Sequence, residues 1–263
     1  MEQEPVIQVK NLTAGYGRTA ILENLNFQVR KGEIFVILGG SGCGKTTVLR
    51  HIIGLLPPLK GQIFIHGKDL TSAAGRQKEA LLQSIGVSFQ SGALFGSMTL
   101  LENVCLPLEE FTDLPQTLIE QIAAIKLRLV GLNGYEEHLP AQLSGGMQKR
   151  AAVARAIALD PDLLLLDEPS AGLDPVTSAG LDQMIVDLSR RLDITFVVVT
   201  HELQSIFAIA DRAIMLDKET RGIIAEGAPR QLKDQPPNET VWRFFHRKAA
   251  SEKAETAKHT GAL

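Results

Sequence analysis

The sequence is poor in cysteine. Cys43 and Cys105 are the only two among 263 residues, and neither stands in a Cys-x-x-Cys pair or near paired histidines. This scarcity argues against a zinc site or a disulfide framework and favours a reducing compartment. The formal net charge of −3 also leaves no large basic field of the kind that binds nucleic acid. We therefore expect no nucleic-acid partner.

Long hydrophobic runs are missing as well. The longest apolar runs, 33–38 and 196–199, have the length of strands, whereas a membrane helix needs about 20 apolar residues. The N-terminal residues 1–5 are acidic and have no apolar core, which argues against a signal peptide. Any membrane role is therefore expected to depend on a partner protein.

Strand-like and helix-like segments alternate along the chain. Strands are predicted at 6–10, 21–29, 34–38, 62–66, 86–89, 163–166, 195–199 and 212–216. Between about residues 91 and 160 the β-branched runs disappear, and helical spacing connects Leu118, Ile122, Ile125 and Leu129. The pattern predicts an α/β fold with a largely parallel sheet and an inserted helical subdomain.

Three parts follow from this pattern. Residues 1–90 and 161–235 are expected to form the α/β core, residues 91–160 the helical subdomain, and residues 236–263 a C-terminal extension. The extension carries an aromatic cluster before a polar end, and residues 251–263 are expected to be disordered.

A glycine-rich segment, 39–46, follows the strand at 34–38 and fits the pattern G-x-x-x-x-G-K-[ST]. Its glycines let backbone N–H groups point at phosphates, and the helix after it directs its positive end there. Lys45 is expected to reach the β- and γ-phosphates, and Thr46 to coordinate magnesium. The segment predicted to bind ATP comprises Gly39, Gly40, Ser41, Gly42, Cys43, Gly44, Lys45, Thr46 and Thr47.

Polar residues end several other predicted strands. Asp167 and Glu168 follow the strand at 163–166, and Gln90 and His201 follow two others. Because the carboxyl ends of parallel strands meet at one edge, Asp167 is placed to hold magnesium and Glu168 to orient or deprotonate water. Taken singly, Asp167 and Glu168 fit a solvated turn about equally well, and an isolated His201 is more often an ordinary loop residue.

A second glycine pair lies in the segment 143–148, Leu-Ser-Gly-Gly-Met-Gln. Ser144 is expected to cap a helix over 147–159, and Gly145 and Gly146 allow close backbone approach, which gives a second anion-binding helix start. Two copies facing head to tail would each supply this helix start to the other's ATP. A capped surface helix explains the local chemistry equally well.

Together these motifs resemble the ABC ATPase family. The phosphate loop, Gln90, the 143–148 signature, the Asp167–Glu168 pair, the loop 170–174 and His201 occur in the family's order. The resemblance implies a P-loop NTPase (RecA-like) core, N-terminal antiparallel strands, and hydrolysis of ATP at the interface of a homodimer. Gln90 would join Thr46 and Asp167 as a magnesium ligand.

The resemblance also implies roles for single residues. Glu168 would be the general base, His201 would contact the γ-phosphate, and Asp174 would link the two sites of the dimer. The residues acting in trans would be Ser144, Gly145, Gly146 and Gln148. Tyr16 looks like the aromatic that stacks on adenine; the alternative is an ordinary surface tyrosine.

A shorter stretch, 88–104, is similar to the ATPases of MCE-type lipid transporters, the Mla system of Gram-negative bacteria. This similarity implies phospholipid movement between inner and outer membranes with a membrane permease, a periplasmic MCE lipid-binding protein and a STAS-domain regulator. It implies a peripheral place on the cytoplasmic face of the inner membrane. Leu94, Phe95 and Met98 would contact the permease's coupling helix, or equally would be core residues.

Two other functions stay open: the same motor on an importer of amino acids or another small solute, and a regulatory ABC module without transport. In the resembling group a C-terminal extension reaches toward the neighbouring ATPase. The aromatic segment 241–247 would do the same, or would pack back on its own domain.

Overall fold

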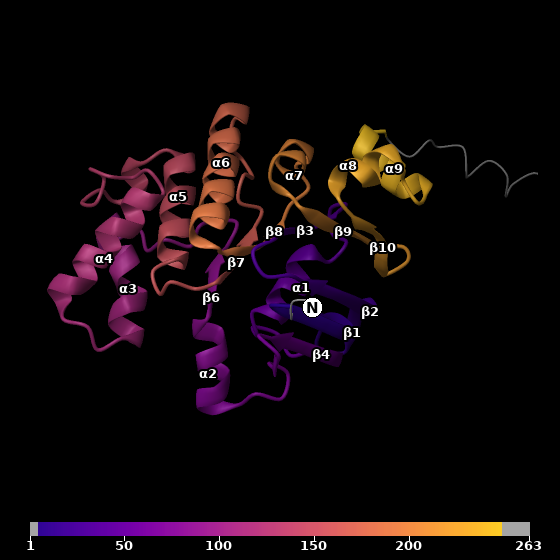
Figure 1. Cartoon of the computed structure of the whole chain (residues 1–263), viewed down its shortest axis with the longest axis horizontal. Helices are drawn as coiled ribbons and strands as arrows, with labels where there is room; N and C mark the ends of the chain where they lie inside the picture. Colours follow the sequence, from indigo (N-terminus) through magenta and orange to yellow (C-terminus); the bar gives the residue numbers. More distant parts are fainter. Residues whose placement is uncertain (1–4, 249–263) are drawn as a thin grey trace, which may run out of the picture.

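Two sheets and their surrounding helices make up residues 5–248, the part of the chain that the computed structural model describes (Figure 1). The larger sheet has six strands in the order β10-β9-β3-β8-β7-β6, of which β10 is antiparallel to its neighbour. The strands are β3 (Ile34–Gly39), β6 (Ile85–Ser88), β7 (Leu163–Asp167), β8 (Thr195–Val199), β9 (Arg212–Asp217) and β10 (Gly222–Gly227). The predicted α/β fold with a largely parallel sheet is confirmed.

The smaller sheet is antiparallel, as predicted for the N-terminal strands. It comprises β2 (Thr19–Val29), β1 (Ile7–Tyr16), β4 (Lys60–Ile65) and β5 (Lys68–Asp69), in that order. The prediction of a strand at 6–10 was too short, because β1 continues past Asn11 to Tyr16 through shifts in its register with β2. Asn11 has a left-handed φ of 49° at the first shift, and such bulges hide the alternation of a strand.

Helices cover both faces of the larger sheet, and a separate group of helices lies beyond its β6 edge (Figure 1). The helices on the faces are α1 (Lys45–Ile52), α2 (Gly75–Gln83), α6 (Pro175–Leu192) and α7 (Leu203–Ile209), followed by α8 (Pro229–Asp234) and α9 (Glu239–His246). Beyond β6 lie α3 (Leu100–Phe111), α4 (Gln116–Leu129), a short 3₁₀ turn (Pro140–Gln142) and α5 (Gly145–Ala156). Among residues 5–248, no helix is both long and apolar enough to cross a membrane.

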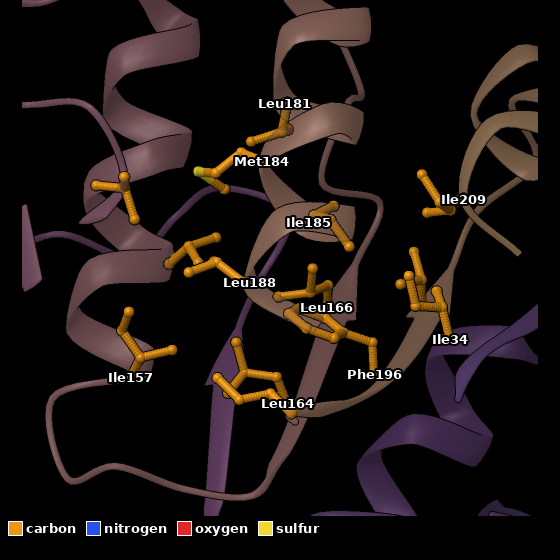
Figure 2. Packing of buried hydrophobic residues seen from close by; sticks show 14 of the residues in the cluster. Ile34, Ile157, Leu164, Leu166, Leu181, Met184, Ile185, Leu188, Phe196 and Ile209 are labelled. Carbon is orange, nitrogen blue, oxygen red and sulfur yellow. The ribbon is translucent and has the colours of Figure 1, made fainter. Parts of the chain in front are cut away.

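The larger sheet is buried on both sides. Residues alternate along β3, so that Ile34 and Val36 face one apolar cluster while Phe35 and Ile37 face the other. Figure 2 shows the first cluster, where Phe196 of β8 packs beneath side chains of α6. Burial on both faces explains why these strands read as continuous apolar runs.

Two helices differ in detail from their patterns. Most of the residues at helical spacing in α4 lie off its buried face: Leu118, Ile125 and Leu129 are exposed. Only Ile122 of that set packs, partly buried, against the core, whose buried α4 members are Ile119, Ala123 and Leu127. The helix predicted over 147–159 was placed too late, because Ser144 caps α5 and the helix runs from Gly145 to Ala156. The division into core, helical subdomain and extension stays a prediction.

The aromatic segment near the C-terminus forms α9. Phe245 is buried, and its ring lies 5.7 Å from that of Phe207 on α7, so this residue packs back on its own domain. Trp242 is 40% exposed and stacks on His246. The predicted disorder of residues 251–263 falls outside the described residues.

Candidate active site

The phosphate loop connects β3 to α1 through backbone that only glycine accepts. Gly39 has a φ of 150°, and a Cβ on it would lie 2.5 Å from the carbonyl oxygen of Leu216 and 2.6 Å from Sγ of Cys43. Gly44 caps α1 with a φ of 103°, so the helix begins at Lys45 with its free N–H groups aimed at the loop. Burial raises the pKa of the Cys43 thiol, which therefore stays neutral and serves as a packing group.

Lys45 is the buried cation of this loop. Its side chain turns back over the loop, and Nζ donates to the carbonyl oxygens of Gly39 at 3.0 Å and Gly40 at 3.1 Å. The residue is only 8% exposed. A buried ammonium next to the free N–H groups at the start of α1 favours a dense negative charge, as a triphosphate carries.

Thr46 and Asp167 meet across the sheet edge. The Thr46 hydroxyl donates to Oδ1 of Asp167 at 3.1 Å, which joins α1 to the end of β7. Burial raises the pKa of Asp167, while the bond from Thr46 opposes the rise. A buried carboxylate beside a hydroxyl is the donor chemistry that a magnesium ion prefers.

Glu168 occupies a strained position directly after β7. Its φ of 47° lies in the left-handed region, which costs a non-glycine residue on the order of 1 kcal/mol or more. The strain persists because its backbone N–H is bonded to Val199 of β8 at 2.8 Å. Nδ1–H of His201 donates to Oε1 of Glu168 at 2.8 Å, and Oε2 is buried without a hydrogen-bond partner among residues 5–248.

Three of the four predicted strand-end residues, Gln90, Glu168 and His201, line one hollow. Its volume is about 370 Å³, and residues of the phosphate loop line it together with the strand-end residues. Its lining residues are Ile21, Ser41, Gly42, Gly44, Lys45, Thr46, Thr47, Gln90, Glu168 and His201. Asp167 lines an adjoining hollow that Thr46 and Gln90 also border. The structure therefore brings these predicted site residues together.

The signature segment lies outside the hollow of the phosphate loop. Ser144 caps α5 by accepting from the N–H of Met147 at 3.3 Å, and Ser144 and Gly145 are exposed. A Cβ on Gly146 would lie 2.2 Å from Cγ2 of Thr177, so glycine is required where α5 approaches α6. Gln148 donates from Nε2 to the carbonyl oxygens of Pro140 and Leu143, which braces the segment.

Asp174 and Tyr16 have local contacts beyond their predicted roles. Asp174 caps α6 by accepting from the N–H groups of Val176 and Thr177, each at 3.0 Å. Tyr16 ends β1, is 41% exposed, and its hydroxyl oxygen accepts from the Thr47 hydroxyl at 3.3 Å. The dimer role of Asp174 and the adenine role of Tyr16 stay predictions.

Sequence patterns gave no indication of Lys149. Its Nζ donates to the carbonyl oxygen of Gln90, which ties α5 to the loop after β6. Burial lowers the pKa of Lys149, while Asp167 and Glu168 attract its charge. A lysine on a helix is usually solvated, so its residue type did not single it out. The one sequence signal is its position, two residues after Met147 of the signature.

Similarity to known proteins agrees with this geometry. The family described as ABC transporter matches residues 22–171, which is more than half of the chain. The chain belongs to the ABC transporter family. This ABC ATPase is 44% identical over 227 residues to an intermembrane phospholipid transport system ATP-binding protein, MlaF, of Haemophilus influenzae, covering 86% of this chain and 85% of that protein. The MlaF of Escherichia coli K12 is 39% identical, covering 88% and 85%.

Another relative is named for the transport of a different molecule. The "Probable ribonucleotide transport ATP-binding protein mkl" of Mycobacterium leprae is 43% identical over 210 residues, which cover 80% of this chain and 60% of that protein. The names of the relatives thus agree on ATP binding and transport and differ on what is transported.

Solved structures share the fold. The dimeric ATP-binding cassette MJ0796, in a post-hydrolysis state with ADP and phosphate, is 31% identical with a TM-score of 0.76, over 84% of this chain and 98% of its own. CbiO1 of Clostridium perfringens, part of the ABC transporter complex cbiONQ, is 27% identical with a TM-score of 0.79, over 93% and 99%. The predictions of a P-loop NTPase fold, ATP binding and ATP hydrolysis are confirmed.

Proposed function

We propose that this ABC ATPase drives phospholipid transport between inner and outer membranes. The observation that carries the proposal is the identity with two MlaF proteins along 85% of their lengths. In this proposal the chain works as a homodimer on the cytoplasmic face of the inner membrane. Its partners are a membrane permease, a periplasmic MCE lipid-binding protein and a STAS-domain regulator.

The phosphate loop holds the triphosphate of ATP in this account. Lys45 exchanges its carbonyl partners for the β- and γ-phosphates, and the N–H groups at the start of α1 bind the same oxygens. Thr46, Asp167 and Gln90 would hold a magnesium ion, which neutralises phosphate charge and leaves room for waters. The aromatic ring of Tyr16 stacks on the adenine ring.

Glu168 acts as the general base. Glu168 lines the phosphate-loop hollow, and its Oε2 has no hydrogen-bond partner among residues 5–248, which leaves this oxygen available to accept a proton from the attacking water. His201 fixes the other oxygen and thereby orients the carboxylate. The hydrogen bond from the Glu168 N–H to the carbonyl oxygen of Val199 holds the strained backbone, and with it this carboxylate, in place.

The homodimer completes each site. Ser144 and Gly145 are exposed at the start of α5, where free N–H groups favour an anion. Facing the phosphate loop of a second copy, this helix start contacts the γ-phosphate in trans. Support comes from the dimeric cassette MJ0796, which is 31% identical.

An apolar groove is the proposed binding site for the permease. Its volume is about 320 Å³, and it lies between β6, α2, α3 and α5, lined by Pro107, Phe111, Arg155 and Leu159 among others. Phe95 is 51% exposed, with the Arg155 guanidinium 6.0 Å from its ring centre. Leu94 instead packs partly buried against the core, so Phe95 is the better candidate contact.

A second candidate is the same motor with another cargo. The mycobacterial relative named for ribonucleotide transport favours it, although the match spans only 60% of that protein. Both candidates share the ATP site, so they differ only in the partners and the transported molecule.

Affinity purification from native membranes tests the proposal. The tagged full chain is purified after detergent solubilisation, and co-purifying proteins and lipids are identified by mass spectrometry. A polytopic permease, an MCE-domain protein and phospholipid support lipid transport. A permease with a solute-binding protein and no MCE partner would replace this cargo with a small solute.

A further inference from the structure

His51 is a buried histidine that the catalytic account does not use. It lies on α1, one turn after Thr47, and is only 1% exposed. Nε2 accepts a hydrogen bond from the backbone N–H of Gly15 at 3.0 Å, and Nδ1 lies 2.9 Å from the carbonyl oxygen of Leu56. Both ring nitrogens are therefore engaged with backbone groups.

These partners fix the form of the imidazole. Leu56 offers only an acceptor, so Nδ1 carries the proton, and Gly15 offers only a donor, so Nε2 presents its lone pair. Burial lowers the pKa of His51, which agrees with a neutral ring. A side chain without polar atoms would leave the N–H of Gly15 without its partner, and unpaired buried donors are costly.

The hydrogen bond from Gly15 to His51 is next in sequence to Tyr16, the proposed adenine platform. Gly15 lies in the tight end of β1, where a Cβ would come within 2.0 Å of the carbonyl oxygen of Thr19. Tyr16 follows it, and its hydroxyl oxygen accepts from Thr47 at 3.3 Å and from Arg50 at 3.1 Å. Three residues of α1 thus hold two successive residues of β1.

The three α1 residues that contact the end of β1 lie on the same face of the helix. Thr47, Arg50 and His51 are at positions i, i+3 and i+4, which share a helix face. Thr47 and Arg50 bind the end of the tyrosine side chain, whereas His51 binds the backbone at its base. The same helix begins at the phosphate loop, so it connects the two ends of a bound nucleotide.

We propose that His51 is a positioning residue that sets Tyr16 at a fixed distance from the phosphate loop. The inference rests on the proposed role of Tyr16 as the adenine platform. A platform held in place before binding loses less freedom when the nucleotide arrives, which raises affinity. His51 does not touch ATP in this account and acts only through Gly15 and Tyr16.

Binding of two probes separates this role from a general structural one. The affinities of the full-length protein for ADP and for inorganic tripolyphosphate are measured by calorimetry. For His51→Phe we expect ADP affinity to fall about tenfold, which corresponds to ~1.4 kcal/mol, with tripolyphosphate affinity unchanged. His51→Gln keeps a donor and an acceptor and should recover much of the loss. His246→Phe, at an exposed site on α9, is the control and should change neither affinity.

A double-mutant cycle with Tyr16→Ala completes the test. In the Tyr16→Ala background, His51→Phe should cause no further loss of ADP affinity. An equal loss for both probes, or a full additional loss in that background, would overturn the inference. If Tyr16→Ala alone leaves ADP affinity unchanged, the adenine role of Tyr16 fails; if only His51→Phe is without effect, the positioning role fails.

Hydrogen exchange of the unmodified protein gives a second test that needs no variant. The Gly15 amide should exchange slowly even without nucleotide, because its donor is bonded to a buried acceptor. Exchange at the rate of an exposed loop would contradict the positioning role.

Discussion

The imidazole of His201 lies 2.8 Å from Oε1 of Glu168, joining the ends of the neighbouring strands β7 and β8. Oε2, the other oxygen of the carboxylate, is buried and has no hydrogen-bond partner within the described residues 5–248. The two residues are 33 positions apart in sequence, so the sheet brings them together. In the proposed mechanism Glu168 is the base, and His201 would position its carboxylate.

Glu168→Gln is expected to bind ATP normally and to lose hydrolysis by about 10²- to 10⁴-fold, because the amide cannot accept the proton of water. Phosphate release and nucleotide binding are measured separately. Glu202→Gln is the control, because Glu202 lies 3.7 Å from Nε2 of His201 but is exposed. Turnover by Glu168→Gln within a few-fold of the wild type rules out the general-base role.

Asn103 organises the loop that presents Phe95. It is fully buried; Oδ1 accepts from the N–H of Phe95, and Nδ2 donates to the carbonyl oxygens of Phe95, Met98 and Thr99. Asn103→Leu should cost about 2–4 kcal/mol of unfolding free energy, since several buried backbone groups lose their partner. It should also remove stimulation of ATPase activity by the permease.

The measurements are urea unfolding and ATPase rates with and without the co-purified permease. Thr99→Ala is the matched control, because it removes only the cap of α3 and should cost about 1 kcal/mol. Full permease stimulation in a folded Asn103→Leu variant contradicts the role of this loop.

Arg212 joins β9 to the turn before β3. Its guanidinium binds Glu33 at 2.6 Å and also binds Glu226 and the carbonyl oxygen of Gln28, while it stacks over Phe35. Arg212→Met should lower the unfolding free energy by about 3 kcal/mol, because the buried Glu33 loses its charged partner and, among residues 5–248, keeps only the N–H of Arg30.

Denaturant unfolding measures this loss. Arg243→Met is the control, since Arg243 pairs with the exposed Glu239 on one helix and should cost no more than about 0.5 kcal/mol. Adding Glu33→Gln to Arg212→Met should recover part of the stability. Equal small effects of the two arginine substitutions would show that Arg212 contributes little.

Asp182 gives a pH-dependent stability. It is 5% exposed between α6 and α7, and burial raises the pKa of its carboxyl group, with the Ser205 hydroxyl opposing the rise. The folded state therefore binds the proton more tightly than the unfolded state, so ionisation destabilises the fold as pH rises through the folded pKa.

Asp182→Asn should raise the melting temperature at pH 8 by about 2–4 °C, and the difference should shrink as pH falls toward 4. Asp187→Asn is the control for replacing a carboxylate by an amide on the same helix. A lower melting temperature of Asp182→Asn at pH 8 would mean that the charge itself stabilises the fold.

The parts of the site that follow from local sequence were predictable. The apolar run of β3 and the glycines after it determine the phosphate loop, and the run of β7 places Asp167 and Glu168 at the same sheet edge. These patterns depend on neighbours in sequence and on the rule that parallel strands end together.

Other features depend on contacts between distant residues. The strand β10 was not predicted, and it exists because 222–227 pairs with β9. Three features have no local signal: the left-handed φ of Glu168, the hydrogen bond from Lys149 to Gln90 and the hydrogen bond from Gly15 to His51. The exposed apolar residues of α4 show the same limit, because spacing predicts a helix but not the face that neighbours cover.

The most direct test of the central claim is ATP-dependent transfer of labelled phospholipid. The complex purified through the tagged chain is reconstituted in vesicles, and label movement to or from the MCE-domain protein is followed over time. The account predicts transfer that requires ATP and stops with Glu168→Gln in the same complex. Full ATP hydrolysis with no ATP-dependent movement of phospholipid would contradict it.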